Sequence, residues 1–433
     1  MNEGEATSEA GFDPPANPIP SAVSPARGEE RIVSLDFIRG IAVMGILLAN
    51  IVAFGQPFTA YMYPDAFAVP HGETADWMWV AQFVLVDGKM RGLFTLLFGA
   101  GLVLFMDRAW AAGATRWLQV RRLLWLGLFG LAHFYLLWRG DILFLYAVTG
   151  LVAVLCLRWS AKAQLTVGLL GYFAGAIFFV GAMVFPYFVV DTDLGEQVAF
   201  AESRTAVVAA QRDDLADGER EIEIIGQGTY GDFVRHNVAE HGTQPFASLF
   251  LLGFEALPLM LLGMALYRMG LLGGERDRAR IARWGWIGVA IGTAITIPIA
   301  LWAHGAGLTY YGTLAAFAGF STLPRLPVVI GLALLLALVG DRARGWLAER
   351  VRAAGRAAFT NYLGTSVVMV LVFHGWAGGL HGQLGRGELY LVVLATWAVI
   401  LVWSKPWLAR FNYGPLEWVW RCLTYGRLFP LRR

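Results

Sequence analysis

The sequence has little charge and almost no cysteine for its length. Asp, Glu, Lys and Arg make up 15% of the 433 residues, whereas a soluble domain carries about 25%. Hydrophobic residues make up 57%, with 17 Trp and 28 Phe among them. A soluble fold of this size cannot cover so much apolar surface with so few charges. The composition therefore predicts an all-α polytopic membrane protein and disfavours cytosolic enzymes and secreted scaffolds.

Other absences exclude further classes. The net charge is only +2, so we expect no nucleic-acid partner. The two cysteines, Cys156 and Cys422, have no metal-ligating company, so neither a disulfide nor a metal site is predicted. The sequence lacks a Walker motif, a GxSxG elbow, HExxH and CxxC, which disfavours nucleotide hydrolysis and zinc proteolysis. Residues 1–30 lack the apolar run of a signal peptide and are predicted to be a disordered cytoplasmic tail.

Ten apolar segments, each of about 17–25 residues, are long enough to span a bilayer. They lie at 33–56, 90–107, 118–138, 141–157, 164–190, 246–267, 284–303, 324–341, 357–376 and 388–403. The third and fourth are predicted to form a tight hairpin. This gives an N-terminal half at 31–190, an insert at 191–245 and a C-terminal half at 246–433, with five spans in each half.

Basic residues in the short loops predict the orientation, because cytoplasmic loops are enriched in Lys and Arg. They gather in every second loop and in the C-terminal tail, whereas 304–322 has none. Both termini are therefore expected in the cytoplasm. The acidic insert 191–245 is predicted to form a small helical cap outside. The outer segment 57–89 contains TADWMWVAQFVL, which is typical of an interfacial aromatic helix.

Several polar and ionisable side chains fall at membrane depth, where they are costly and usually face a cavity or a partner. In the predicted topology most gather in the outer leaflet: Asn50, Asp87, Arg91, His133, Arg139, Asp141, Glu255 and His374. Depth alone does not show that they share a cavity. Glu255 favours a functional role or a buried network, because no basic residue follows it within one helical turn.

The other polar residues also have ordinary interpretations. Asp36 and Arg39, near the inner face, can pair at i,i+3, and Asp87 and Arg91 can pair at i,i+4. Asp141 can clasp Arg139 across the hairpin. Both His133 and Asn50 can act as interhelical hydrogen-bonding residues. His71 can be an ordinary loop residue.

Three stretches are similar to the signatures of the YeiB family of bacterial inner-membrane proteins: RIVSLDFIRGIAVMGILLANIVAF, FVLVDGKMRGLFTLLFGAG and LLWRGDILFLYAVTGL. The segment from AAFTNYLGTSVVMVLVFHGW to FNYGPLEWVWRCLTYG resembles the C-terminal DUF418 domain. Together these cover most of the chain outside the tail and the insert. The resemblance implies a multi-pass protein of the inner membrane.

The pattern SLD-x-x-RG before a span also resembles heparan-α-glucosaminide N-acetyltransferases and the wider membrane acyltransferase superfamily. Many members have a catalytic histidine near the end of the first span, a position that Asn50 matches here. The acetyltransferase branch has Asn there and a His some residues later. His71 is the candidate for that His, at a longer spacing, so the identity of a base stays open.

The resemblance favours an acyltransferase that moves an acyl group from cytoplasmic acyl-CoA to a small-molecule or glycan acceptor outside. Such chemistry needs a base and donors for an oxyanion. His133 or His71 would be the base, and Asp141 would orient it. Asn50 and Arg91 would contact the acyl carbonyl, and Asp36 and Arg39 would shape the inner entrance.

The alternative is a transporter of small polar metabolites, in which Glu255, Asp141 and His133 form a proton relay. A structural or regulatory membrane subunit also stays open. The remaining candidates for substrate contact are Asp87, Arg139 and His374. The oligomeric state, including a homodimer, is left open by the sequence.

Overall fold

The computed structural model describes residues 32–273 and 277–433, and the predicted tail at 1–30 lies outside them. In this part of the chain all regular elements are helical, and Phe411 and Arg432 form an isolated bridge. The helices are α1 (Val33–Gly55), α2 (Glu73–Leu85), α3 (Lys89–Ala111), α4 (Arg116–Leu136), α5 (Leu143–Leu155), α6 (Ala161–Asp191), α7 (Ala201–Gln227), α8 (Tyr230–His241), α9 (Gln244–Arg268), α10 (Arg278–Gly305), α11 (Tyr310–Leu314), α12 (Thr322–Arg342), α13 (Trp346–Arg356), α14 (Ala358–Phe373), α15 (Arg386–Arg410) and α16 (Pro415–Tyr425).

Among the described residues, 7 helices are long and apolar enough to cross a membrane, or up to 8 if the bent pair α13 and α14 is one span. All ten predicted segments fall on helices, but the hairpin α4–α5 does not meet these criteria. Helix α5 has 13 residues, or about 20 Å, against a hydrocarbon core of about 30 Å. Three arginines near the start of α4 lower its hydropathy. The structure thus supports a polytopic helical protein with fewer full-length spans than predicted.

Helix α1 is the central element of the bundle. In its apolar window 72% of the residues are buried, against 28% in α6, 22% in α10 and 28% in α15, whose outer faces are available to lipid. It packs against α3, α12, α13, α14 and α15. The chain around Gly40 lies against α13, whereas the chain after Gly55 reaches α7, where Phe58 N donates to Glu221. Helix α1 therefore connects the two ends of the bundle.

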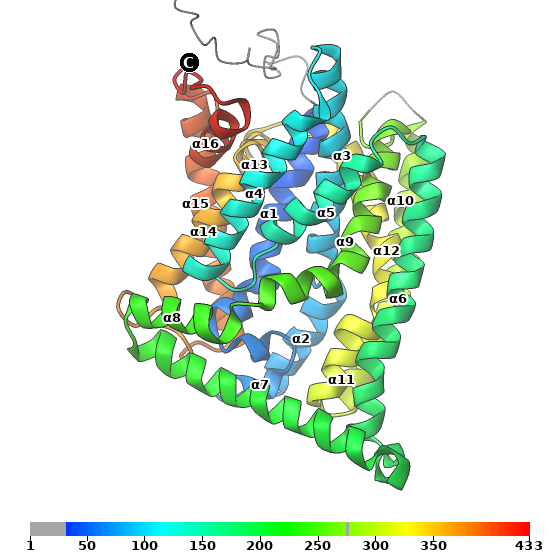
Figure 1. Cartoon of the computed structure of the whole chain (residues 1–433), viewed down its shortest axis with the longest axis vertical. Helices are drawn as coiled ribbons and strands as arrows, with labels where there is room; N and C mark the ends of the chain where they lie inside the picture. Colours follow the sequence, from blue (N-terminus) through cyan, green and yellow to red (C-terminus); the bar gives the residue numbers. More distant parts are fainter. Residues whose placement is uncertain (1–31, 274–276) are drawn as a thin grey trace, which may run out of the picture.

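Helices α7 and α8 form the cap predicted for the insert, and Figure 1 shows α7 lying across one end of the bundle with the C-terminus at the opposite end. Thr229 caps α8 through a reciprocal capping box with Asp232. The backbone N–H of Gly375 donates to the carbonyl of Ile225 at 2.8 Å, which joins the cap to the loop after α14. The helical nature of the insert is confirmed, while its extracytoplasmic side stays a prediction.

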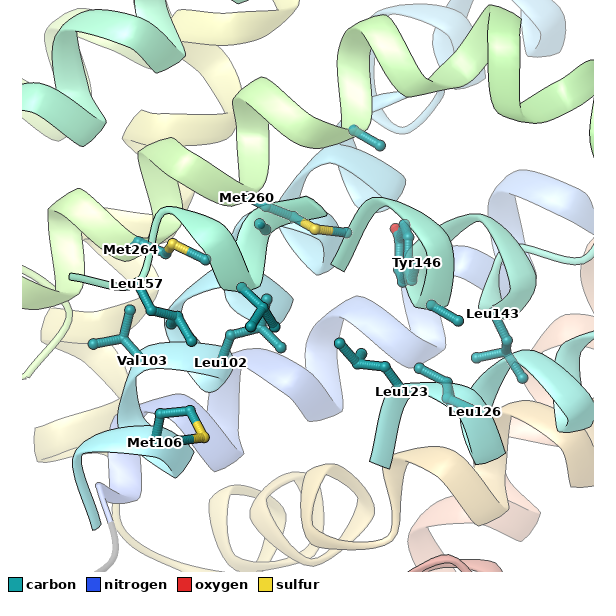
Figure 2. Close-up of a cluster of buried hydrophobic side chains, with 14 of the residues drawn as sticks. Leu102, Val103, Met106, Leu123, Leu126, Leu143, Tyr146, Leu157, Met260 and Met264 are labelled. Carbon is teal, nitrogen blue, oxygen red and sulfur yellow. The ribbon is translucent and has the colours of Figure 1, made fainter. Parts of the chain in front are cut away.

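The core that supports the hairpin lies between α3, α4, α5 and α9. Figure 2 shows Leu102 of α3, Leu126 of α4, Tyr146 of α5 and Met260 of α9 converging in one apolar cluster. Helices α3 and α9 approach closely, because a Cβ on Gly99 would lie 2.1 Å from the carbonyl oxygen of Met260. Small residues at such crossings allow two backbones to touch. This packing fixes the helices that carry the polar residues described below.

The predicted span 357–376 begins at a sharp break. Helices α13 and α14 meet at an angle of 86°. Asn361 holds the break, since its side-chain amide donates to the carbonyl of Ala354 at 2.9 Å and its oxygen accepts from Trp403 at 3.0 Å. The break directs α14 from the α16 end of the bundle toward the cap, and so fixes the depth of the residues on α14.

Candidate functional site

Five of the polar residues singled out in the sequence line one cavity of about 280 Å³, which we name the cap-side chamber. They are Asn50 on α1, Arg91 on α3, Arg139 and Asp141 in the turn between α4 and α5, and Glu255 on α9. The structure thus brings these five residues to one cavity, which their predicted depth alone did not show.

Glu255 is the shared counter-ion of two arginines at this chamber. Its carboxylate accepts from Arg91 Nη2 at 2.6 Å and from Arg325 Nη1 at 3.2 Å. Glu255 and Arg325 have side chains only 4% and 3% exposed, so the charges are almost fully desolvated. A buried charge needs such partners, because leaving it unpaired is costly. Arg91 therefore pairs with α9 rather than with Asp87, which lies between α2 and α3.

Arg325 is positioned by a π-helical turn. Residues 315–320 form this turn before α12, and Arg325 donates to the carbonyl of Phe317 at 2.7 Å and to the Ser321 hydroxyl at 2.9 Å. Such turns change the hydrogen-bonding register of a helix and are frequent at functional sites. The turn thus provides acceptors that a regular helix would use internally.

A chain of three side chains runs from the cap-side chamber into the bundle. Asp141 Oδ1 lies 2.7 Å from His133 Nδ1, and His133 Nε2 lies 2.8 Å from the hydroxyl oxygen of Ser366 on α14. The side chains of His133 and Asp141 are 0% and 1% exposed, and Ser366 is 1% exposed. An ionised carboxylate only accepts, so beside an ionised Asp141 the proton is on Nδ1, and a neutral imidazole then accepts the Ser366 O–H at Nε2. Of the two histidines that the sequence offered to Asp141, the structure places His133 against it.

Asp141 is held from its other side as well. Its Oδ2 accepts the backbone N–H of Phe144 at 2.8 Å, in the first turn of α5. The short turn between α4 and α5 brings Asp141 back to His133, eight residues earlier in the chain. Arg139, which the sequence also offered as a partner for Asp141, instead binds Asp217 at 3.2 Å and Glu221 at 3.0 Å on the cap.

A second cavity, of about 270 Å³, lies toward the α16 end, and we name it the basic chamber. Four arginines line it: Arg39, Arg122, Arg356 and Arg421. The Arg122 guanidinium lies over the rings of Phe105 and Trp420, at 4.6 and 4.4 Å from their centroids. Aromatic rings beside guanidinium groups form a surface that suits a phosphorylated, planar ligand.

A third cavity, of about 10 Å³, lies between the two chambers, and we name it the connecting cavity. It shares Asn50 and Trp138 with the cap-side chamber and Tyr362 with the basic chamber, and Ser366 lines it. The Tyr362 ring centroid lies 5.2 Å from that of His133. The connecting cavity has room for about one water molecule, and Ser366, the last member of the Asp141–His133–Ser366 chain, lines it.

The other predicted site residues lie outside the cap-side chamber. Asp36 pairs with Arg39 at 3.5 Å, as the i,i+3 interpretation predicted, and Arg39 belongs to the basic chamber. Asp87 is buried and accepts from Gln82 at 3.0 Å. His71 pairs with Asp76 at 2.7 Å, and His374 packs on the ring of Phe233 at 4.6 Å. His133 lines none of the three cavities, but it hydrogen-bonds Asp141 of the cap-side chamber and Ser366 of the connecting cavity, whereas His71 pairs with Asp76 away from all three.

One group on the cap has the composition of a metal site. Potential ligand atoms of Asp217, His236 and His241 lie within 4.8 Å of one another. The Arg139 guanidinium donates into the same group, at 2.9 Å to His241 Nε2. A fixed positive charge opposes a cation there, so we assign the group to attachment of the cap.

Ser366, Arg325 and Tyr362 are the residues of this region that sequence reasoning missed. A single hydroxyl in an apolar helix is also typical of ordinary helix packing, so Ser366 gave no separate signal. Arg325 did give one, because an arginine in the run TLPRLPVVIGL is costly at membrane depth.

Comparison with known proteins finds a family model for the C-terminal part and relatives that cover nearly the whole chain. The family described as "Protein of unknown function (DUF418)" matches residues 266–427. The chain is 31% identical to "Uncharacterized protein YeiB" of Escherichia coli (strain K12), over 93% of this chain and 98% of that protein. It is 28% identical to "Uncharacterized protein YxaH" of Bacillus subtilis (strain 168), over 95% and 99% of the two chains. No solved structure matches the chain significantly.

Proposed function

The chain belongs to the YeiB family, and we propose that it is a membrane acyltransferase. In this proposal an acyl-CoA binds at the basic chamber, and a hydroxyl or amine acceptor binds at the cap-side chamber. The observation that carries the proposal is the buried Asp141–His133 pair, 2.7 Å apart, which bonds to Ser366 on the wall of the connecting cavity. The pair gives a base, and the chambers give each substrate its own side.

The basic chamber suits the nucleotide end of a CoA thioester. CoA carries phosphate groups and an adenine ring, so it needs positive charge together with planar surfaces. Four arginines supply the charge, and the rings of Phe105 and Trp420 lie against Arg122. Guanidinium groups bind phosphate oxygens in a fork geometry and also stack on rings. The acyl end would extend toward the connecting cavity.

His133 is the proposed base. The carboxylate of Asp141 fixes the tautomer with the proton on Nδ1 and stabilises the imidazolium that forms when Nε2 takes a proton. Asn50 lines both the connecting cavity and the cap-side chamber, so its amide is the proposed donor to the developing oxyanion. Arg91 and Glu255, on the wall of the cap-side chamber, would bind the polar acceptor.

The proposal includes an orientation in the bacterial inner membrane. The basic chamber would face the cytoplasm, because its arginines are those of the predicted inner loops and tail. The cap would then lie outside, with the short α4–α5 hairpin completing ten membrane segments and both termini inside. The partners in this arrangement are the lipid bilayer and a small-molecule or glycan acceptor, in a monomer or a homodimer.

The connecting cavity of about 10 Å³ favours transfer of a small group over transport of a whole metabolite. An acyl group needs only to reach the connecting cavity from one side, while a transported solute must move from one chamber to the other. The transporter hypothesis therefore requires a large rearrangement of α1, α4 and α14 that the transfer reaction does not.

The test uses protein purified in detergent, radiolabelled acetyl-CoA and a panel of sugar and amino-alcohol acceptors. We expect wild-type protein to label an acceptor and His133→Gln to lose transfer on the order of 10²–10⁴-fold. His71→Gln is the matched control and should keep its activity, because His71 pairs with Asp76 away from the chambers.

Binding of acetyl-CoA is measured separately by calorimetry. Arg122→Gln should weaken it, whereas Arg344→Gln, an exposed residue outside the chamber, should not. Absence of acetyl-CoA binding by the wild type would refute the proposal. Solute flux into proteoliposomes without any acyl donor would favour the transporter instead.

A further inference from the structure

The position of Ser366 indicates that the acyl group is transferred in two steps. Resting on the proposed function, we infer that the Ser366 hydroxyl is the nucleophile, and that it holds the acyl group as an ester between the two chambers. The acyl-CoA and the acceptor then never need to meet.

The geometry has the elements of an activated serine. Ser366 Oγ lies 2.8 Å from His133 Nε2, and His133 Nδ1 lies 2.7 Å from Asp141 Oδ1. A nucleophile bound to a base, with the base oriented by a carboxylate, is the pattern of covalent catalysis. The three residues come from three separate segments, α14, α4 and the α4–α5 turn. The arrangement is therefore made by the tertiary fold and not by one helix's own hydrogen bonding.

The surroundings of Ser366 also fit a carrier of a short acyl group. Ser366 lines the connecting cavity, which Asn50, Trp138 and Tyr362 line as well. Trp138 is 7% exposed and Tyr362 is 5% exposed, so little water reaches the ester. Exclusion of water protects a reactive intermediate from hydrolysis. The connecting cavity has room for about one water molecule, so its walls must move to hold even an acetyl group, and must move further for a longer chain.

Each of the two steps forms one bond to the acyl carbon and breaks another. In the first, Ser366 Oγ attacks the thioester carbonyl, and its proton moves to His133 Nε2. The C–S bond breaks, and the thiolate leaves as CoA–SH with the proton from His133. In the second, His133 takes the proton of the acceptor hydroxyl or amine, which attacks the ester carbonyl. The C–O bond to Ser366 breaks, and His133 returns the proton to Oγ.

A hydrogen bond that only joins α14 to α4 would give the same distances, and the experiment separates the two roles. Wild-type protein in detergent is incubated with acetyl-CoA in the absence of an acceptor. Intact-mass measurement should show one acetyl group on the protein, and peptide mapping should place it on Ser366. Addition of the acceptor should remove it. A purely structural serine would carry no acetyl group.

Three variants complete the test. Ser366→Ala should lose the acetylated species and lower transfer on the order of 10²–10⁴-fold, with its melting midpoint measured in parallel. Ser366→Cys keeps a nucleophile of similar size and should be acetylated as a thioester even if Ser366→Ala does not fold. Thr296→Ala removes another buried hydroxyl, which bonds within α10 and lies outside the three cavities; it is the matched control and should be acetylated like the wild type.

The outcomes distinguish the inference from the function on which it rests. Folded Ser366→Ala with wild-type transfer would overturn the covalent step and leave direct transfer with His133 as base. Acetylation that maps to another residue, or that persists in Ser366→Ala, would overturn it as well. If the wild type neither binds acetyl-CoA nor transfers its acetyl group, the proposed function itself fails.

Discussion

Replacement of Glu255 by Gln tests whether the cap-side chamber is organised by buried charge. The substitution keeps the shape of the side chain and removes the charge that Arg91 and Arg325 share, at 2.6 and 3.2 Å. At an effective dielectric constant of about 20, each such contact has a Coulomb energy of roughly 5–6 kcal/mol before desolvation is subtracted. Removing one partner of a buried ion pair costs about 3–5 kcal/mol, because the remaining charge stays buried.

The matched control is Glu349→Gln. Glu349 pairs with Lys405, but these side chains are 51% and 47% exposed, and exposed pairs contribute about 0–1 kcal/mol. We expect Glu255→Gln to lower the thermal midpoint in detergent by several degrees, and Glu349→Gln to leave it nearly unchanged. Both measurements use the same protein concentration and detergent.

A double variant isolates the interaction itself. Arg325→Met removes one of the two arginines that Glu255→Gln leaves without a counter-charge, so the combined loss should be smaller than the sum of the single losses. Strictly additive losses, or equal midpoint shifts for Glu255→Gln and Glu349→Gln, would refute the account of Glu255 as the counter-ion of the chamber.

Two further predictions concern packing and pH. Gly99→Ala should lower the thermal midpoint, because its Cβ would lie 2.1 Å from a carbonyl oxygen of α9. The control Gly364→Ala has nothing within 4 Å of its Cβ and should be neutral or stabilising. Equal shifts of the thermal midpoint in the two variants would contradict the close contact. Burial, with a smaller effect of the Arg139 charge, lowers the pKa of His241 to about 4. An unfolded histidine has a pKa near 6.5, so the stabilisation by neutral His241 is complete above about pH 6.5 and is lost as the pH falls toward 4. Hydrogen exchange of α7 and α8 should accelerate over that range in the wild type and less in His241→Gln; the same acceleration in both would exclude His241 as its cause.

The positions of most helices could be predicted from the sequence, because long apolar runs leave few alternatives in a bilayer. The prediction of span length was least successful at α4 and α5. The apolar sequence continues beyond the ends of α5, so it did not indicate that this helix has only 13 residues. The predicted start of the span at 357 agrees with the start of α14, but the 86° break that separates α14 from α13 was not predicted. Asn361 holds this break through Ala354 on α13 and Trp403 on α15, and the contact with α15 depends on the tertiary fold.

The candidate site was predicted in part for a related reason. Asp141 follows His133 closely, so their contact could be proposed from the hairpin alone. Ser366 lies 233 residues from His133 along the chain, and one hydroxyl in an apolar helix carries no signal of its own. Arg325 was visible as a charge at membrane depth, but its pairing with Glu255 depends on the π-helical turn.

The sequence by itself determined that this protein is helical, is apolar enough to cross a membrane and buries costly polar side chains, because the cost of each such side chain in lipid is a property of that residue. Only the tertiary structure decided which of them meet. It separated His71 from the chambers, divided the polar interior into two cavities and placed Ser366 against His133. These outcomes depend on how helices cross and bend, and that is set by packing between distant segments rather than by the pattern within any one of them.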